Sequence, residues 1–458
     1  MHIKKFTLFL LANLFTLGLM AEGYQLNTQS ARQIGMAHMG TALRLGSENM
    51  VFNPAGLSFM KGNADISFGI TGIKSKVKFT SGSYTAETDN PLGTPIFGYA
   101  GFRISDKFFA GVSISNPAGN SLVWPDNWSG THFVQDISLQ AFSVQPTISF
   151  KINDQWSIGA GVMANFGSFE LNKGLLPIGA LSPYLQHPQV PQAFKDIISN
   201  TNNISTLNAN LQGDSKITYG FNVGVMFTPN NQWTFGVSYR SKVMMTLEEG
   251  KATLSYGSPE LATLFSTLTT PFITPEQPNP LYNPNIAEAF KASGTFAAEL
   301  PIPSNLQIGA SYKPSGDWLL SAELQYVGWK AYDYLVINFE NPPLTSSQHK
   351  NFSNSMIYRI GGEYYASEKL TLRAGFIYDT TPVDKMLYSP ETPGANKPSL
   401  TAGLTFAPSQ KFALDLGLQY LNGQNTTGSM PQAAPLPAFT GNYKSTALLP
   451  SIGLRFNF

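Results

Sequence analysis

The chain has 458 residues, of which only 12% are charged, and its 29 Lys and Arg residues nearly balance its 28 Asp and Glu residues. This charged fraction is about half of the roughly 25% found in soluble domains. The balance of charge argues against the extended basic surface that nucleic acid binding requires, and the absence of cysteine excludes thiol chemistry, disulfides and cysteine metal sites. After the first twenty residues, no segment approaches the roughly 18 uninterrupted apolar residues of a membrane-spanning helix. A polytopic helical membrane protein is therefore excluded.

Residues 1–21 have the pattern of a secretory signal peptide. Lys4 and Lys5 precede an apolar run over residues 6–19, and Ala21 is a small residue before the expected cleavage site. The alternative, an N-terminal anchor helix, is disfavoured because the apolar run is too short to span a membrane comfortably. The pattern predicts that the protein is exported.

Residues 22–62 do not alternate regularly between apolar and polar side chains. They are rich in Gly, Ala, Ser and Met, show a helical pattern around residues 31–39, and contain the turn-forming tetrapeptide Asn53-Pro54-Ala55-Gly56. This segment therefore differs in kind from the rest of the chain.

From residue 63 onward, the chain contains segments in which apolar and polar residues alternate. This pattern is typical of β-strands that bury one face. Short polar turns such as Ser105-Asp106 alternate with long connections. We expect strands at residues 63–79, 95–104, 107–116, 135–152, 155–171, 212–228, 231–249, 298–313, 316–340, 354–366, 369–381, 397–407, 411–424 and 441–458. The long connections are at about 80–94, 117–134, 172–211, 250–297, 341–353, 382–396 and 425–440.

The last strand indicates where the exported chain goes. Its alternate positions from Leu448 to Phe458 are apolar, with polar residues between them, and the chain ends in an aromatic residue. Such a strand is typical of outer-membrane barrels.

An even number of strands, with short turns on one side and long loops on the other, is the architecture of a bacterial transmembrane barrel. The sequence predicts an all-β fold, a 14-stranded antiparallel transmembrane β-barrel over residues 63–458, with both termini in the periplasm. A soluble sandwich or propeller would require polar outer faces, whereas Trp233, Phe235 and Val237 form an apolar one. A lumen this wide requires filling, so residues 22–62 are expected to form a hatch inside it rather than a disordered tail.

The opposite faces of the strands would point into the lumen, and they hold charged residues of both signs. These residues are Arg240, Glu323, Arg359, Glu363, Arg373, Asp415 and Arg455. They either form an ion-pair network that braces the wall or include an arginine that also binds an anionic ligand headgroup. The sequence leaves both readings open, because which arginine lacks a partner depends on geometry.

The two longest loops, at about 172–211 and 250–297, contain amphipathic helical patterns. Ser258 is suited to cap a helix that has Pro259 at its first position. One face of that helix carries Leu261, Leu264, Phe265 and Leu268, and a second short helix carries Phe194, Ile197 and Ile198. These faces either pack on each other as a lid or form the first groove for an apolar ligand.

Catalytic arrangements are not evident. The five histidines show no spacing typical of a triad or a metal site, and there is no Gly-rich phosphate loop or dinucleotide fingerprint. We therefore predict a protein that is not an enzyme and needs no cofactor or metal.

Several stretches resemble a known family. The start GYQLNTQSARQIGMAHMGTAL, followed by VFNPAGL with its Asn53, Pro54 and Ala55, resembles the N-terminal hatch of the outer-membrane long-chain fatty acid transporter family, the FadL type. Residues 124–162, 303–339 and 369–386 resemble later parts of that family. The resemblance covers nearly the whole mature chain and is absent from the two longest loops.

The resemblance implies a hatch-plugged barrel that takes up long-chain fatty acids passively, with no partner except the ligand and membrane lipid, and works as a monomer. It also implies capture by extracellular loops, a pocket above the hatch and lateral release through a kink in the third strand. The corresponding residues here are Asn116, Pro117, Ala118 and Gly119. Proline and glycine weaken a ladder at that point, although the strand could equally end there in a turn.

Alternative functions remain open from the sequence. Within the family, the ligand could be a monoaromatic or another hydrophobic compound. A general porin or an adhesin on the same scaffold is a reading of a different class. A porin would pass small polar solutes and have no use for a hatch, and an adhesin would tolerate changes in the lumen or at residues 116–119.

Overall fold

The computed structural model describes residues 23–126, 128–177, 185–186, 190–200, 205–279, 282, 284, 294–340, 346–432 and 437–458. The expected signal peptide, residues 1–21, lies outside these ranges. Among the described residues, no helix is both long and apolar enough to cross a membrane.

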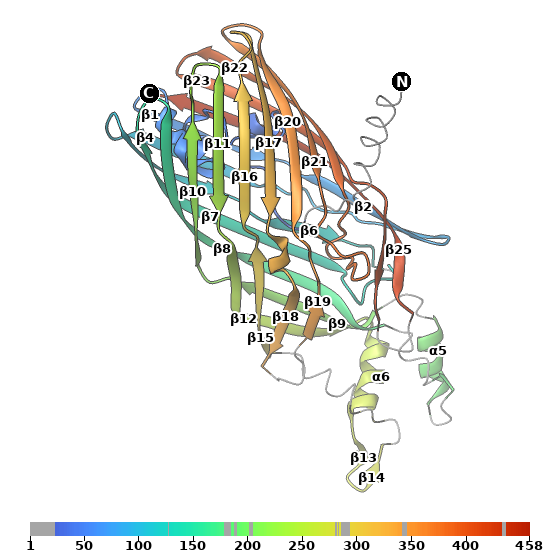
Figure 1. Ribbon diagram of the computed structural model, residues 1–458. Helices are drawn as coiled ribbons and strands as arrows, with labels where there is room; N and C mark the ends of the chain where they lie inside the picture. Colours follow the sequence, from blue (N-terminus) through green and yellow to red (C-terminus); the bar gives the residue numbers. More distant parts are fainter. Residues whose placement is uncertain are drawn as a thin grey trace, which may run out of the picture.

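One antiparallel sheet closes on itself to form the body of the molecule (Figure 1). Its segments are β1 (Ala64–Thr71), β2 (Lys74–Ser81), β3 (Tyr84–Glu87), β4 (Ile96–Arg103), β5 (Phe108–Ser115), β6 (Gly119–Val123), β7 (Asp136–Lys151), β8 (Trp156–Pro177), β9 (Ser205–Asp214), β10 (Thr218–Phe227), β11 (Trp233–Arg240), β12 (Val243–Tyr256), β15 (Gly294–Ile302), β16 (Asn305–Tyr312), β17 (Trp318–Val327), β18 (Tyr334–Phe339), β19 (Ser346–His349), β20 (Ser355–Tyr365), β21 (Leu370–Asp379), β22 (Lys397–Ser409), β23 (Phe412–Asn422), β24 (Thr426–Met430) and β25 (Phe439–Asn457).

Several of these segments are successive pieces of one longer strand. β1 and β2, for example, both pair with β25, and β5 and β6 both pair with β7. The pairing of β25 with β1, in register from Asp65 with Asn457 to Thr71 with Ser451, closes the barrel. The predicted fold, a 14-stranded antiparallel barrel, is confirmed.

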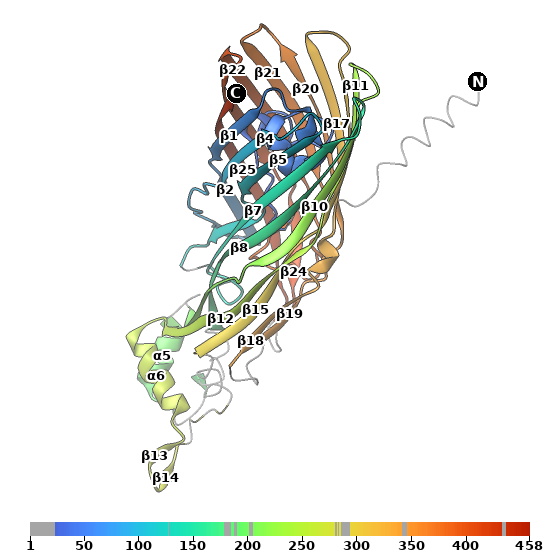
Figure 2. The same ribbon diagram turned by 90° about the vertical axis from the view of Figure 1, so that its left-hand side faces the viewer.

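The two ends of the barrel differ. The end that carries the short hairpin turns and the C-terminus, here called the turn end, lies at the top of Figure 1. The opposite end, the loop end, carries α5 (Gln192–Asn200), α6 (Pro259–Thr269) and the small hairpin of β13 (Phe272–Thr274) and β14 (Gln277–Pro278). Figure 2 shows these helices extending beyond the wall.

The wall alternates as a membrane barrel requires. Outward positions expose apolar side chains such as Phe68, Trp233 and Leu418, and the intervening inward positions are buried. An outer face of this kind is stable in contact with lipid.

Four of the connections predicted at the loop end contain strands: β3 lies within 80–94, β6 within 117–134, β19 within 341–353 and β24 within 425–440. The connection predicted at 80–94 is a tight turn at Gly82 and Ser83, and Gly82 has a φ of 57°, a backbone conformation that favours glycine. The chain then continues as β3 and is interrupted at 88–95, where Pro91 and Pro95 cannot donate to a ladder. The connection predicted at 117–134 begins with a further strand, β6.

Residues 23–63 lie inside the barrel, in the half nearer the turn end (Figures 1 and 2). They form α2 (Ala31–Ile34), η2 (Gly46–Glu48), α3 (Asn49–Phe52) and η3 (Pro54–Phe59). The helix expected around 31–39 ends early, because Ala37 and His38 adopt left-handed φ values of 55° and 59°. We call this segment the hatch.

Candidate functional site

The hatch packs against a belt of glycines on the inner wall. Six cross-strand pairs of two glycines each face the hatch: Gly69 with Gly453, Gly101 with Gly111, Gly159 with Gly224, Gly236 with Gly309, Gly361 with Gly375, and Gly403 with Gly417. A seventh described pair, Gly428 with Gly441, faces Tyr388 and Phe79 instead. A Cβ added at Gly403 would lie 2.8 Å from the Gly35 Cα of the hatch, and one at Gly375 would lie 2.8 Å from the Ala37 Cβ. The glycines therefore let the hatch backbone approach the wall closely.

One acidic residue replaces glycine in this belt and holds the hatch. Glu323 on β17 lies opposite Gly309, and its carboxylate accepts hydrogen bonds from the backbone N–H groups of Gly40 at 3.1 Å and Thr41 at 2.9 Å. The Nη1 of Arg359 on β20 donates to the same carboxylate at 3.0 Å. Both side chains are 1% exposed, so this buried pair fixes the hatch to the wall.

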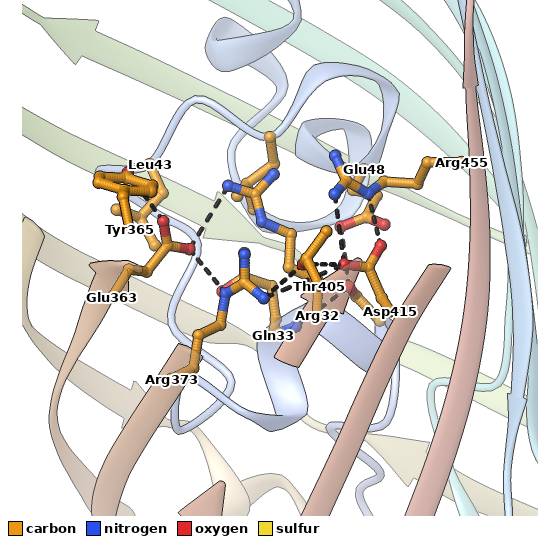
Figure 3. Close-up of polar contacts among 12 residues, drawn as sticks. Arg32, Gln33, Leu43, Glu48, Glu363, Tyr365, Arg373, Thr405, Asp415 and Arg455 are labelled. Atoms are coloured by element: carbon orange, nitrogen blue, oxygen red, sulfur yellow. Dashed lines mark hydrogen bonds and ion pairs between the residues drawn. The ribbon is translucent and has the colours of Figure 1, made fainter. Parts of the chain in front are cut away.

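A second ionic network joins the hatch to the adjoining strands β20, β21, β23 and β25 (Figure 3). Arg32 of the hatch and Arg373 both point at the Glu363 carboxylate, at 3.4 and 2.8 Å. Arg455 pairs with Asp415 at 2.5 Å, and Arg373 lies 4.0 Å from the same carboxylate. These ion pairs link strands of the wall to one another and to the hatch, as the ion-pair reading of the sequence expects.

Glu48 extends this network within the hatch. Its carboxylate accepts hydrogen bonds from the hydroxyls of Ser30 and Ser67, each at 2.8 Å. Burial raises the pKa of Glu48. The hatch is thus joined to β1 as well as to β20 and β17.

The Asn53-Pro54-Ala55 motif is a connection between the hatch and the barrel. The Asn53 Oδ1 accepts from the Ala55 N–H at 3.2 Å and caps η3, with Pro54 at the first position. Its Nδ2 donates to the carbonyls of Thr41 at 2.7 Å and Val225 at 3.0 Å. The side chain thereby links two hatch turns to β10.

Among the predicted lumen arginines, Arg240 differs from the others. Its Nη2 donates to the Val51 carbonyl of the hatch at 2.8 Å, and no described carboxylate forms an ion pair with it. It lines a small polar cavity together with Gln25, His38 and Asn305. Arg240 is therefore a lumen cation that is not neutralised by a wall carboxylate.

A larger cavity, of about 210 Å³, lies on the side of the hatch that faces the loop end of the barrel. We call it the lumen cavity. The hatch contributes residues 25–28 and His38, and the wall contributes apolar side chains such as Ile357 and Ile377. Arg359 also lines it, and the Nε of this arginine has no hydrogen-bond partner among the described residues. The cavity thus combines apolar side chains with polar and charged ones, which include Arg359, Asp379 and Lys397, a combination suited to an amphiphile.

The wall is interrupted beside this cavity. β4 pairs with β5 as far as Phe97 with Ser115, and beyond them no backbone hydrogen bond joins residues 90–96 to residues 116–122 within the described chain. A cavity of about 530 Å³, here called the wall cavity, occupies the interruption and reaches the outward-facing Phe142. The two cavities share the lining residues Leu26, Ile73, Ser75, Gly119, Asn120 and Ser121.

The predicted kink residues, 116–119, form one edge of this interruption. The Asn116 side chain replaces ladder bonds, since its Oδ1 accepts from the Ile96 N–H at 2.9 Å and its Nδ2 donates to the Ala141 carbonyl at 2.9 Å. Because β6 continues the strand after the break, the strand does not end in a turn there.

The first residues of the hatch occupy the edge that the kink leaves. The Leu26 N–H donates to the Pro117 carbonyl at 3.0 Å, and the Gly119 N–H donates to the Tyr24 carbonyl at 2.9 Å. Gln25 and Ala118 form an isolated bridge between them. Sequence reasoning missed this pairing and the glycine belt, although glycines recurring at inward positions of successive strands were a visible signal for the belt.

The helices of the long loops form as expected. Ser258 caps α6, accepting from the Leu261 N–H at 3.3 Å, and Pro259 begins it. Leu261, Leu264 and Phe265 are buried, and Phe194 is half-buried. The side chains of Ile197, Ile198 and Leu268 lie outside the described part. The described apolar face of α6 is thus covered by protein.

Comparisons with known proteins agree with this architecture. Residues 13–458 match the family described as outer membrane protein transport protein (OMPP1/FadL/TodX), a family of transporters rather than enzymes. The long-chain fatty acid transport protein of Escherichia coli O6:H1 is 24% identical over 447 residues, covering 95% of this chain and 94% of that protein. Outer membrane protein P1 of Haemophilus influenzae is 24% identical over 492 residues, covering both chains completely.

Solved structures show the same fold. A Pseudomonas aeruginosa FadL homologue superimposes with a TM-score of 0.76 at 19% identity, covering 95% of this chain and all of that one. The Ralstonia pickettii toluene transporter TbuX gives a TM-score of 0.65 at 17% identity, covering 94% of this chain and 98% of that one.

Proposed function

The chain belongs to the outer membrane protein transport protein family (OMPP1/FadL/TodX), and we propose that it carries long-chain fatty acids or similar hydrophobic molecules passively across the outer membrane. The observation that carries this proposal is that six residues line both the lumen cavity and the wall cavity, so that the two cavities adjoin at the interruption of the wall. In this scheme a ligand in the lumen cavity leaves sideways past these shared residues into the wall cavity, and so enters the membrane without crossing water. The short turns and both termini face the periplasm in this scheme, and the protein acts as a monomer.

Polar groups in the lumen support an amphiphilic ligand. Arg359, which also pairs with Glu323, lines the lumen cavity, and Arg240 lies nearby with Gln25 and His38 in a polar cavity. An anionic headgroup bound at either arginine would gain a charge-assisted hydrogen bond. Each methylene buried by its chain adds about 0.8 kcal/mol. The other arginines, Arg373 and Arg455, are committed to wall carboxylates.

The hatch controls release in this proposal. Its residues 24–26 pair with the kink at 117–119, so a shift of the hatch alters the lumen cavity and the edge of the opening together. The loop residues Phe194, Ile197, Ile198, Leu261, Leu264, Phe265 and Leu268 take part in capture only if the α6 face opens, since its described apolar side chains are buried.

Uptake of a monoaromatic compound is the second candidate. The lumen cavity, at about 210 Å³, is smaller than the roughly 300 Å³ at which drug-sized ligand pockets begin, and this favours a compact ligand. The fold likeness to the Ralstonia pickettii toluene transporter TbuX is compatible with this alternative.

A reversible lock on the hatch tests the proposed route. In Ala42→Cys/Gly309→Cys the two Cβ atoms would lie 3.4 Å apart, close to the roughly 3.5–4.5 Å of a disulfide, and the chain has no other cysteine. Cells without their own transporter, expressing this variant, should take up labelled oleate or toluene only after reduction. The single-cysteine variants are the controls. Uptake unaffected by the lock would contradict the hatch mechanism, and passage of sugars by the wild-type protein would indicate a porin.

A further inference from the structure

Lysines form one strip on the outer wall. The strip lies where the apolar outer face of the barrel, here called the apolar belt, ends toward the loop end. Along the first strand, outward positions are apolar at Phe68 and Ile70 and then become Lys74, Lys76 and Lys78. The three lysine side chains are 57%, 56% and 51% exposed. The strand therefore changes from lipid-facing to cationic within a few residues.

The position of this change matches the edge of a membrane. A barrel strand tilted by about 40° rises roughly 2.5 Å per residue along the barrel axis, so an apolar band about 25 Å tall spans about ten residues. Ten residues separate Ala64, where β1 begins, from Lys74. The lysines thus lie at the level where lipid headgroups replace acyl chains at the loop end.

The neighbouring strand adds to the same strip. On β25, Leu448 is level with Lys74, and Lys444 lies directly opposite Lys78. Like charges directly opposite each other destabilise a sheet unless an anion lies between them. Lys444 forms no ion pair with any described residue.

Nearby carboxylates neutralise only part of this charge. Glu87 on β3 pairs with Lys76 and, at 3.5 Å, with Lys78, and Asp89 lies 3.4 Å from Lys74. Two carboxylates thus serve four lysines. At the corresponding level of β7, β8 and β9 the outward charged residues are acidic, namely Asp136, Glu170 and Asp214. The positive strip is therefore a local feature and not a property of the whole rim.

We propose that the strip formed by Lys74, Lys76, Lys78 and Lys444 binds the phosphate-bearing headgroup of an outer-leaflet glycolipid. The acyl chains of this lipid pack on the adjoining apolar belt, on the side of the turn end. Charge complementarity and the continuity of the strip with that belt identify this occupant. Inward positions of the same strand, Ile73 and Ser75, line the wall cavity. The lipid would consequently stand beside the opening. The inference rests on the orientation given with the proposed function.

Lipid retention by the purified protein tests this site without any transported ligand. The full chain in detergent is offered a phosphorylated lipid A, the same lipid after phosphatase treatment, and phosphatidylglycerol, and bound lipid is measured by native mass spectrometry. We expect the phosphorylated glycolipid to be retained about tenfold more than its dephosphorylated form, less so at high salt. The variant Lys74→Gln/Lys76→Gln/Lys78→Gln/Lys444→Gln should lose this preference.

The matched control is Lys216→Gln/Lys251→Gln, which removes two outward lysines elsewhere on the wall and should keep the preference. Equal retention of the two glycolipids by the wild-type protein, or an unchanged preference in the fourfold variant, would overturn the proposal. So would equal retention of phosphatidylglycerol, which would indicate nonspecific attraction of anions. Failure of the wild-type protein to transport would overturn the proposed function alone, because lipid retention is measured independently.

Discussion

The two halves of the lumen use the same kinds of side chain for different purposes. In the half near the turn end, the hatch rests on glycines, and Arg373 has carboxylates on two sides. In the half near the loop end, the wall is interrupted, and the cavities are lined by Arg359, which has one carboxylate partner, and by Arg240, which has none among the described residues. An arginine in this barrel is therefore structural or available according to the number of carboxylates that its neighbouring strands provide.

The hatch is the element that joins the two halves. Its middle part is held by Glu323 and the glycine belt, whereas its first residues pair with the kink beside the opening. If the half near the turn end is rigid and the half near the loop end is adjustable, substitutions near the turn end should lower stability. Substitutions near the loop end should instead change transport.

The largest expected effect follows from removing Glu323. In Glu323→Leu, Arg359 is left buried without its partner and two hatch N–H groups lose their acceptor, which should lower the free energy of unfolding by about 3–5 kcal/mol. Unfolding in urea, followed in detergent, measures this. The double variant Glu323→Leu/Arg359→Met should regain most of the loss because it removes the unpaired charge. A single variant as stable as the wild type would mean that the hatch is not held here.

Acid should weaken the hatch through His38. Burial lowers the pKa of His38 to about 4, whereas the unfolded chain titrates near 6.5. Between these values only the unfolded state takes up the proton, so stability is complete above about pH 6.5 and falls as the pH decreases toward 4. From pH 7 to pH 4.5 the wild type should lose about 2–3 kcal/mol more than His38→Gln, measured by urea unfolding at both pH values. Parallel losses in the two proteins would contradict this assignment.

The structure shows which features can be predicted from the alternation of apolar and polar residues along a strand. Alternation predicted the strands and the inward placement of Glu363, Arg373 and Asp415, because side-chain direction depends only on parity. It did not predict which charges pair, since pairing depends on strand register and on the position of Arg32 in the hatch. β3 was missed because its four residues form a strand only by pairing with β2. The pairing of Leu26 with Pro117 links distant segments and has no local signal.

The glycine belt should be sensitive to a single methyl group. Gly403→Ala places a Cβ 2.8 Å from the Gly35 Cα, so the hatch must shift, and we expect a loss of about 1–2 kcal/mol in the free energy of unfolding. Gly316→Ala, in a turn where an added Cβ meets nothing within 4 Å, is the matched control and should change little. Limited proteolysis of the hatch, compared in the two variants, reports whether it has loosened. Equal digestion of both would show that the close approach at Gly403 is not needed.

At the interruption of the wall we expect the smallest effect on stability together with a clear effect on uptake. An added Cβ at Gly119 would lie 2.9 Å from the Leu26 Cδ1, between the lumen cavity and the wall cavity. Gly119→Leu should fill this passage and reduce uptake of the transported ligand severalfold, while the free energy of unfolding changes by no more than about 1 kcal/mol because the close atom is the far end of the flexible Leu26 side chain, which can move aside. Gly316→Leu, exposed in its turn, is the control for side-chain size. Initial uptake rates and urea unfolding of the same preparations separate the two effects. Unchanged uptake in Gly119→Leu would place the exit elsewhere. A large loss of stability would show that the lumen is packed as tightly near the loop end as near the turn end.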